Sequence, residues 1–103
     1  MRWADETKVL EALRPVIDPE LGLSIVDLGL VTRIEVSPHG AVHVAYTTTA
    51  PACPLASFIG SGILQALARL PDVASATAEL SAEPWDPSRM SLAAREQLAG
   101  AER

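Results

Sequence analysis

The sequence predicts an α+β domain: a small mixed β-sheet, built from a hairpin and a right-handed β-α-β crossover, with helices packed mainly on one face. Two segments of alternating apolar and polar residues flank Pro38-His39-Gly40, which is typical of a hairpin. Apolar residues recur at helical spacing between Pro54 and Leu70. A third alternating segment follows, so the strands before and after that helix are expected to be parallel.

The chain is expected to open with a helix from Asp5 to Arg14, because Asp5 is a good N-cap and apolar residues then follow at helical spacing. Pro15 ends this helix, since the residue before a proline avoids the α region. Residues 16–29 carry dense turn signals, and within them Ser24 to Asp27 fits a single helical turn.

The hairpin strands are predicted at Leu30 to Ser37 and Ala41 to Thr48. The main helix follows, with Pro54 at its first position, where no backbone N–H is needed. Its predicted buried face is Phe58, Ile59, Ile63, Leu67 and Leu70. Gly60 and Gly62 are interpreted as places where this helix packs closely on the sheet or on a second subunit.

The third strand is predicted at Val73 to Leu80, with Ala74, Ala76, Ala78 and Leu80 facing inward. A loop from Glu83 to Pro87 follows, in which Trp85 is expected to cover the core. A last helix is expected from Ser91, its N-cap, to Leu98.

The length of 103 residues indicates one domain, covering 1–103. A net charge of −5 argues against nucleic-acid binding and against docking on an anionic membrane. The chain has no apolar run long enough to span a bilayer and no apolar signal core near Met1, so a cytoplasmic location is expected. A single cysteine excludes an internal disulfide, which agrees with a reducing compartment.

That cysteine, Cys53, is the best candidate for chemistry. It lies between a strand end and a helix start, where unpaired N–H groups and the helix dipole favour a thiolate. Pro51 and Pro54 stiffen the loop, and the hydroxyls of Thr47 to Thr49 are expected to donate hydrogen bonds to the sulfur. The structural alternative is that Cys53 is simply a small buried apolar residue.

Other candidate groups are few. A cysteine hydrolase needs a histidine base, but His39 falls in the hairpin turn and His43 on a polar strand face. Asp18, Glu20 and Asp27 are the remaining carboxylates of interest, although Asp18-Pro19 is also an ordinary turn starter. The sequence shows neither a phosphate-binding loop nor a zinc-type cysteine pair.

Three segments together resemble domain-of-unknown-function family fifty-nine, the metal–sulfur cluster biosynthesis family with SufT-like and PaaD-like members. They are Asp18-Pro19-Glu20-Leu21-Gly22 with Ser24 to Val31, then Thr47-x-Thr49-x-Pro51-x-Cys53-Pro54, and finally Trp85-x-Pro87-x-x-Met90-Ser91 with Ala94-Arg95 and Leu98. The matches occur in the family's order and span about residues 5–100. The chain ends without the cysteine-rich segment of PaaD-like members, so it resembles the short general type.

The resemblance implies an accessory factor in iron–sulfur cluster assembly or delivery rather than an enzyme, acting through Cys53. It implies that Asp18, Glu20 and Asp27 lie near the thiol, with Thr47, Thr49 and Pro54 in support. Iron–sulfur assembly proteins and apo-client proteins are the implied partners.

A cluster normally needs four protein ligands, and one cysteine supplies one. We therefore expect no tightly bound cofactor. Cys53 is instead expected to ligate a transient cluster, shared in a homodimer or completed by other thiols, or to act in an adaptor that binds none. A small redox or acyl-transfer thiol enzyme and an interaction domain with an inert Cys53 are the alternatives.

Overall fold

The computed structural model describes residues 5–49 and 53–101, with side chains except at Cys53, Pro54 and 98–101. Its sheet has three strands in the order β1 (Val31–Val36), β2 (Ala41–Tyr46) and β3 (Ser75–Leu80). Strands β1 and β2 form an antiparallel hairpin, and β3 pairs parallel to β2 in an unbroken register. The predicted α+β fold, with its hairpin and parallel β-α-β unit, is confirmed.

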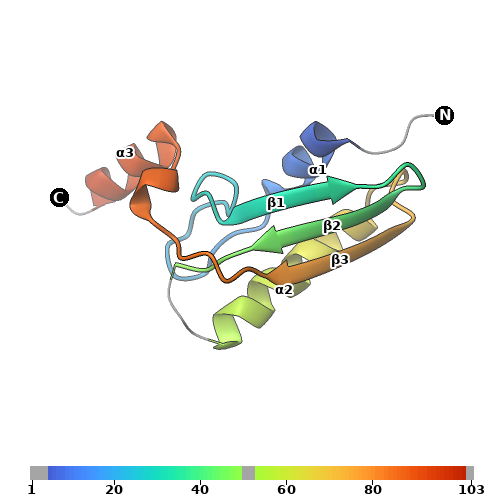
Figure 1. Ribbon diagram of the computed structural model, residues 1–103. Helices are drawn as coiled ribbons and strands as arrows, with labels where there is room; N and C mark the ends of the chain where they lie inside the picture. The colour runs from blue at the N-terminus through green and yellow to red at the C-terminus, as the bar shows by residue number, and fades with distance from the viewer. Residues whose placement is uncertain (1–4, 50–52, 102–103) are drawn as a thin grey trace.

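Helices α1 (Glu6–Leu13) and α2 (Cys53–Ala68) lie on the same face of the sheet (Figure 1). Asp5 caps α1 as predicted, because its side chain accepts a hydrogen bond of 2.8 Å from the Lys8 amide. Three side chains of α2, Ile59, Ile63 and Leu67, are completely buried against the sheet and α1. Each such side chain contributes about 1.5–3 kcal/mol to folding, so these three orient α2 firmly.

Three predicted core positions were wrong: Phe58, Leu80 and Ala74, which is exposed and precedes β3. Phe58 is 60% exposed, because α2 turns Ile59, Ile63 and Leu67 inward and Phe58 lies about 100° around the helix from Ile59. Leu80 is 52% exposed, because it is the last residue of an edge strand. The start of α2 also differs by one residue, since the helix begins at Cys53 rather than Pro54.

The two glycines of α2 are explained by contacts within the chain. A Cβ at Gly60 would clash with the Tyr46 hydroxyl, and a Cβ at Gly62 would lie 3.1 Å from Cγ1 of Val16. Both glycines therefore let α2 approach neighbouring parts of the same molecule. They carry no argument for a second subunit.

The C-terminal segment is fastened to the loop before β1. It contains a 3₁₀ turn (Pro87–Arg89) and helix α3 (Leu92–Ala101), which lies beyond the end of the sheet where β2 and β3 finish (Figure 1). The Ser91 hydroxyl accepts from the Ala94 amide, as the capping prediction required. No helix in the described ranges is long and apolar enough to cross a membrane.

Three successive carbonyl groups hold this segment in place. Those of Asp27, Leu28 and Gly29 accept hydrogen bonds from the Ser91 amide, the Trp85 indole and the Arg89 guanidinium, at 2.7, 2.7 and 2.8 Å. Trp85 also packs against the core, as predicted for a covering side chain. Residues of the third sequence signature thus dock onto residues 27–29, which belong to the first sequence signature.

Candidate functional site

The carboxyl ends of β2 and β3 meet at one end of the sheet, next to the loop of residues 18–29 (Figure 1). Cys53 follows β2 and is the first residue of α2. Ligands commonly collect at the carboxyl ends of parallel strands, and a helix start favours an anion. The Cys53 and Pro54 side chains and Pro51 lie outside the described atoms, so the contacts of the thiol stay a prediction.

Tyr46 fixes the first turn of α2 against the sheet. It is the last residue of β2, and its hydroxyl donates a hydrogen bond of 2.8 Å to the carbonyl of Ala56. The missing side chain at Gly60 leaves room for its ring. Burial raises the pKa of Tyr46, so the neutral donor form is favoured well beyond neutral pH. Tyr46 thus positions the backbone that carries Cys53, a role that the sequence analysis missed.

Asp18 is a buried carboxylate with a full set of partners. Its side chain has no exposure to solvent, and Oδ1 accepts from the amides of Glu20 at 2.7 Å and Leu21 at 3.3 Å. Oδ2 accepts from the Thr49 hydroxyl at 3.3 Å. Asp18 therefore closes its own turn and also binds Thr49, which lies four residues before Cys53.

The hydroxyls of Thr47 and Thr49 both donate hydrogen bonds to acceptors within the protein. Thr47 donates to the carbonyl of Glu83 at 2.8 Å, and Thr49 donates to Asp18. The prediction that these hydroxyls donate to sulfur was wrong for both residues, because protein acceptors already take their protons. They instead hold the approach to Cys53 against the loop after β3 and against the 18–22 turn.

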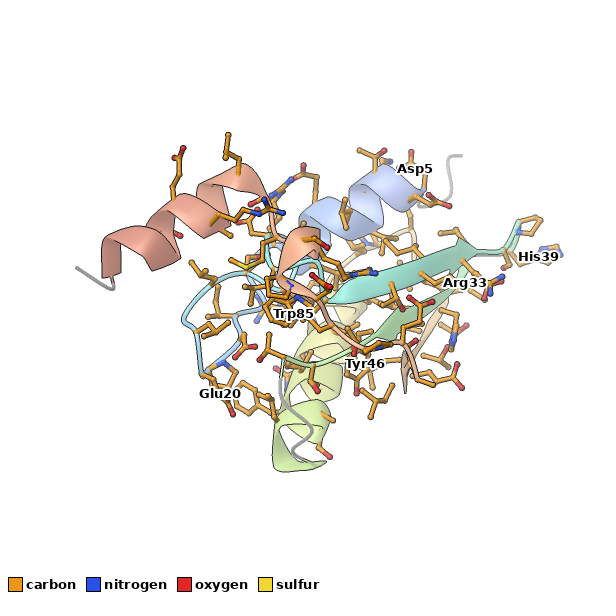
Figure 2. The ribbon with its side chains drawn as sticks, turned by 60° about the vertical axis from the view of Figure 1, so that its left-hand side comes forward. Asp5, Glu20, Arg33, His39, Tyr46 and Trp85 are labelled. Carbon is orange, nitrogen blue, oxygen red and sulfur yellow. The ribbon has the colours of Figure 1, made fainter. Side chains whose placement is uncertain are left out.

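A hollow of about 370 Å³ opens beside these threonines. Its walls come from the end of β2 and from the loop that follows β3: Thr47, Thr48, Thr49, Leu80, Ser81, Ala82, Glu83, Pro84 and Trp85. Trp85 and Glu20 both lie at this end of the molecule, whereas His39 lies at the opposite tip (Figure 2). The hollow has both hydroxyl groups and apolar carbons on its walls, next to the strand end that leads to Cys53.

The three predicted carboxylates have different surroundings. Glu20 is exposed and takes part in the Asp18 turn through its amide. Asp27 belongs to another cluster, since its Oδ1 lies 3.5 Å from both Arg14 Nη1 and the Ser91 hydroxyl. Asp18 is joined to the approach to Cys53, and Asp27 connects the end of α1 to the start of α3.

The histidines are not placed as a base for a thiol at α2. His39 is exposed at the hairpin tip (Figure 2). His43 lies on the sheet face that α1 and α2 leave open, where its ring nitrogens contact the Thr77 hydroxyl at 2.6 Å and Glu79 Oε1 at 3.2 Å. Among the described residues, no three histidine, cysteine or acidic side chains are grouped so that they could hold a metal ion.

Comparison with known proteins places the chain in a family. The family model described as "Iron-sulfur cluster assembly protein" matches residues 6–80. The Fe-S protein maturation auxiliary factor YitW of Bacillus subtilis is 38% identical over 96 residues, which cover 92% of this chain and 94% of the relative. The Fe-S protein maturation auxiliary factor SufT of Staphylococcus aureus is 36% identical over 81 residues, covering 78% and 92%.

Among solved structures, the crystal structure of a DUF59 domain from Bacillus anthracis superimposes with a TM-score of 0.86 at 34% identity, covering 91% of each chain. The resemblance expected from the three sequence signatures is confirmed. The names of the relatives describe maturation factors rather than enzymes, which agrees with the expectation for this chain. This chain therefore belongs to the iron–sulfur cluster assembly protein family.

Proposed function

We propose that this chain is an auxiliary factor that helps iron–sulfur proteins to mature, and that it acts through Cys53. The observation that carries the proposal is the position of the chain's single cysteine at the start of α2, in a family of iron–sulfur assembly proteins. Assembly proteins that supply the cluster and apo-proteins that receive it are the proposed partners.

The bonds around Cys53 support a thiol held on a fixed backbone. Tyr46 fastens the first turn of α2, and Asp18 and Thr47 fasten the strand end on the other side of the loop. Such restraint reduces the conformational entropy that is lost when a thiolate binds a cluster or a partner. The N–H groups at the helix start also stabilise the thiolate.

The number of ligands limits how the factor works. One thiolate per chain, and two in a homodimer, are fewer than the four ligands of a typical cluster. The cluster is therefore cargo that is shared between chains or completed by thiols of a partner, rather than a resident cofactor. An adaptor that joins an assembly protein to its client without binding the cluster is the other form of the same proposal.

The thiol-enzyme alternative gains no support from the described residues. Thiol catalysis of acyl transfer needs a base within hydrogen-bond reach. His43 is engaged by Thr77 and Glu79 on the open face of the sheet, and His39 lies at the hairpin tip.

Two measurements on wild type and Cys53→Ser test the proposal. In cells that lack the wild-type chain, we expect the serine variant to fold normally and to lose maturation of iron–sulfur client enzymes. Normal client activity with Cys53→Ser would refute the role of the thiol. Anaerobic reconstitution with iron and sulfide separates the two forms: a visible charge-transfer band that is lost in the variant indicates a carrier, and no band in either protein indicates an adaptor.

A matched control keeps the number of thiols constant. Ser57 is exposed on α2, one turn after Cys53, so Cys53→Ser combined with Ser57→Cys moves the thiol without removing it. We expect this double variant to fail like Cys53→Ser. Full rescue would show that any exposed thiol on α2 suffices and that the position at the helix start is irrelevant.

A further inference from the structure

The outer face of α2 has an apolar groove that the packing of this chain leaves open. Phe58 is 60% exposed and Ile17 is 42% exposed, and both line one hollow of about 300 Å³. The hollow lies between the segment after α1 and the helix, and its other walls are Pro15, Val16, Gly62, Gln65, Ala66 and Arg69. Large apolar side chains that share one exposed hollow are typical of an interaction site.

The groove has one charged end. Arg69 is the only lysine or arginine of the described residues whose side chain has no ion pair or hydrogen bond; Lys8, Arg14, Arg33, Arg89 and Arg95 all have partners. The Arg69 side chain is exposed, so its guanidinium is open to a group from another molecule. It offers five donors to a carboxylate from another molecule.

The spacing along the groove suggests the shape of what binds there. Phe58 lies in α2 and Arg69 is the first residue after that helix, and eleven residues at about the helical rise separate the two by about 16 Å. Between them lies the small residue Ala66, where a second helix can approach closely. The groove therefore suits a helix with an apolar side chain at one end and a carboxylate about three turns away.

We propose that this surface, the Phe58–Arg69 groove, binds an acidic amphipathic helix of a partner protein. A second copy of this chain is a poorer fit: α1 is already packed on α2, and in α3 the exposed Leu92 and Glu96 are only one turn apart. The proposal requires no participation of Cys53, so its test is independent of the thiol.

The test is an NMR titration of the ¹⁵N-labelled protein with two synthetic helical peptides. The peptides have the same leucine positions and differ only in carrying glutamate or lysine three turns from the first leucine. We expect the acidic peptide to bind more tightly and to shift the amides of Ile17, Phe58, Gly62, Ala66 and Arg69. Equal affinity for both peptides, or shifts confined to another surface, would overturn the proposal.

Three variants sharpen the result. Arg69→Glu is expected to weaken the acidic peptide about tenfold and to favour the basic one. Phe58→Ala is expected to weaken the binding of both peptides. Because Phe58 is largely exposed, we expect this variant to remain folded, so unfolding would not account for the loss of binding. Arg33→Glu is the charge-matched control on the open face of the sheet and should change neither affinity. A wild-type dimer in sedimentation that Phe58→Ala and Arg69→Glu both dissociate would instead identify a second copy as the occupant and refute the partner helix.

Discussion

Asp18 and Asp27 belong to the same loop and to the same sequence signature, yet the fold uses them in opposite ways. Asp18 is completely buried and accepts from two backbone amides and the Thr49 hydroxyl. The side chain of Asp27 is 37% exposed and faces Arg14 and Ser91 across 3.5 Å. The difference shows that an acidic residue in a shared signature can be a buried part of the backbone framework or a solvated link between helices.

Removal of the Asp18 side chain should have the largest effect. Asp18→Ala removes a completely buried side chain and leaves the amides of Glu20 and Leu21 without their acceptor, so we expect a loss of about 3 kcal/mol in the free energy of unfolding. Urea unfolding followed by circular dichroism measures this loss. Asp18→Asn keeps one acceptor oxygen and should lose less. A loss below about 1 kcal/mol in the alanine variant would show that the buried carboxylate is not a structural requirement.

The attachment of the C-terminal segment next to Asp27 gives the second prediction. Gly29 has a φ of 73°, and a Cβ there would clash with the Arg89 backbone, so we expect Gly29→Ala to lose about 2–3 kcal/mol. Gly22, in the Asp18 turn, has a φ of 70° with open space around it, and Gly22→Ala should lose only about 1 kcal/mol. Thermal unfolding of the two variants isolates the steric part, and equal losses would refute the close contact at Arg89.

A third prediction concerns the bond between the Asp18 turn and the approach to Cys53. Thr49→Val removes the hydroxyl that donates to Asp18 and keeps the shape of the side chain. We expect a loss of about 1 kcal/mol. In a double-mutant cycle, Asp18→Asn and Thr49→Val should be coupled by roughly 0.5–1 kcal/mol. Additive losses in the free energy of unfolding would mean that the two side chains do not cooperate in the folded protein.

The sequence predicted the framework well where periodicity and turn residues determine the structure. The Asp5 cap, the hairpin at Gly40 and the parallel pairing of β3 were correct, because each depends on residues close together in the chain or on a general rule of chain connection. The exposed Phe58 was not predicted. Apolar spacing alone cannot tell which of two adjacent residues of α2 faces the sheet when both are large and apolar.

At the candidate site, the sequence identified the residue types but not their partners. Asp18 and Thr49 were both named, and the bond between them depends on how the 18–22 turn folds back onto the end of β2. The hydroxyl of Thr47 was assigned to the wrong acceptor, because its partner, the carbonyl of Glu83, is distant in the sequence and is placed beside it by the pairing of β3 with β2. Tyr46 was missed as a positioning residue, although its place opposite Gly60 could have been inferred from a large and a small residue on facing elements.

The smallest expected effect is at Asp27. The backbone carbonyl of Asp27 holds the Ser91 amide at 2.7 Å, and this bond does not depend on the side chain. The ion pair with Arg14 is long and partly solvated, so Asp27→Asn should lose only about 0.5 kcal/mol at low salt and less at high salt. Arg14→Gln, measured by the same urea unfolding, should lose a similarly small amount. A loss at Asp27 as large as that of Asp18→Ala would mean that the two carboxylates share one structural role after all, and that exposure of a side chain is a poor guide to how this loop is held.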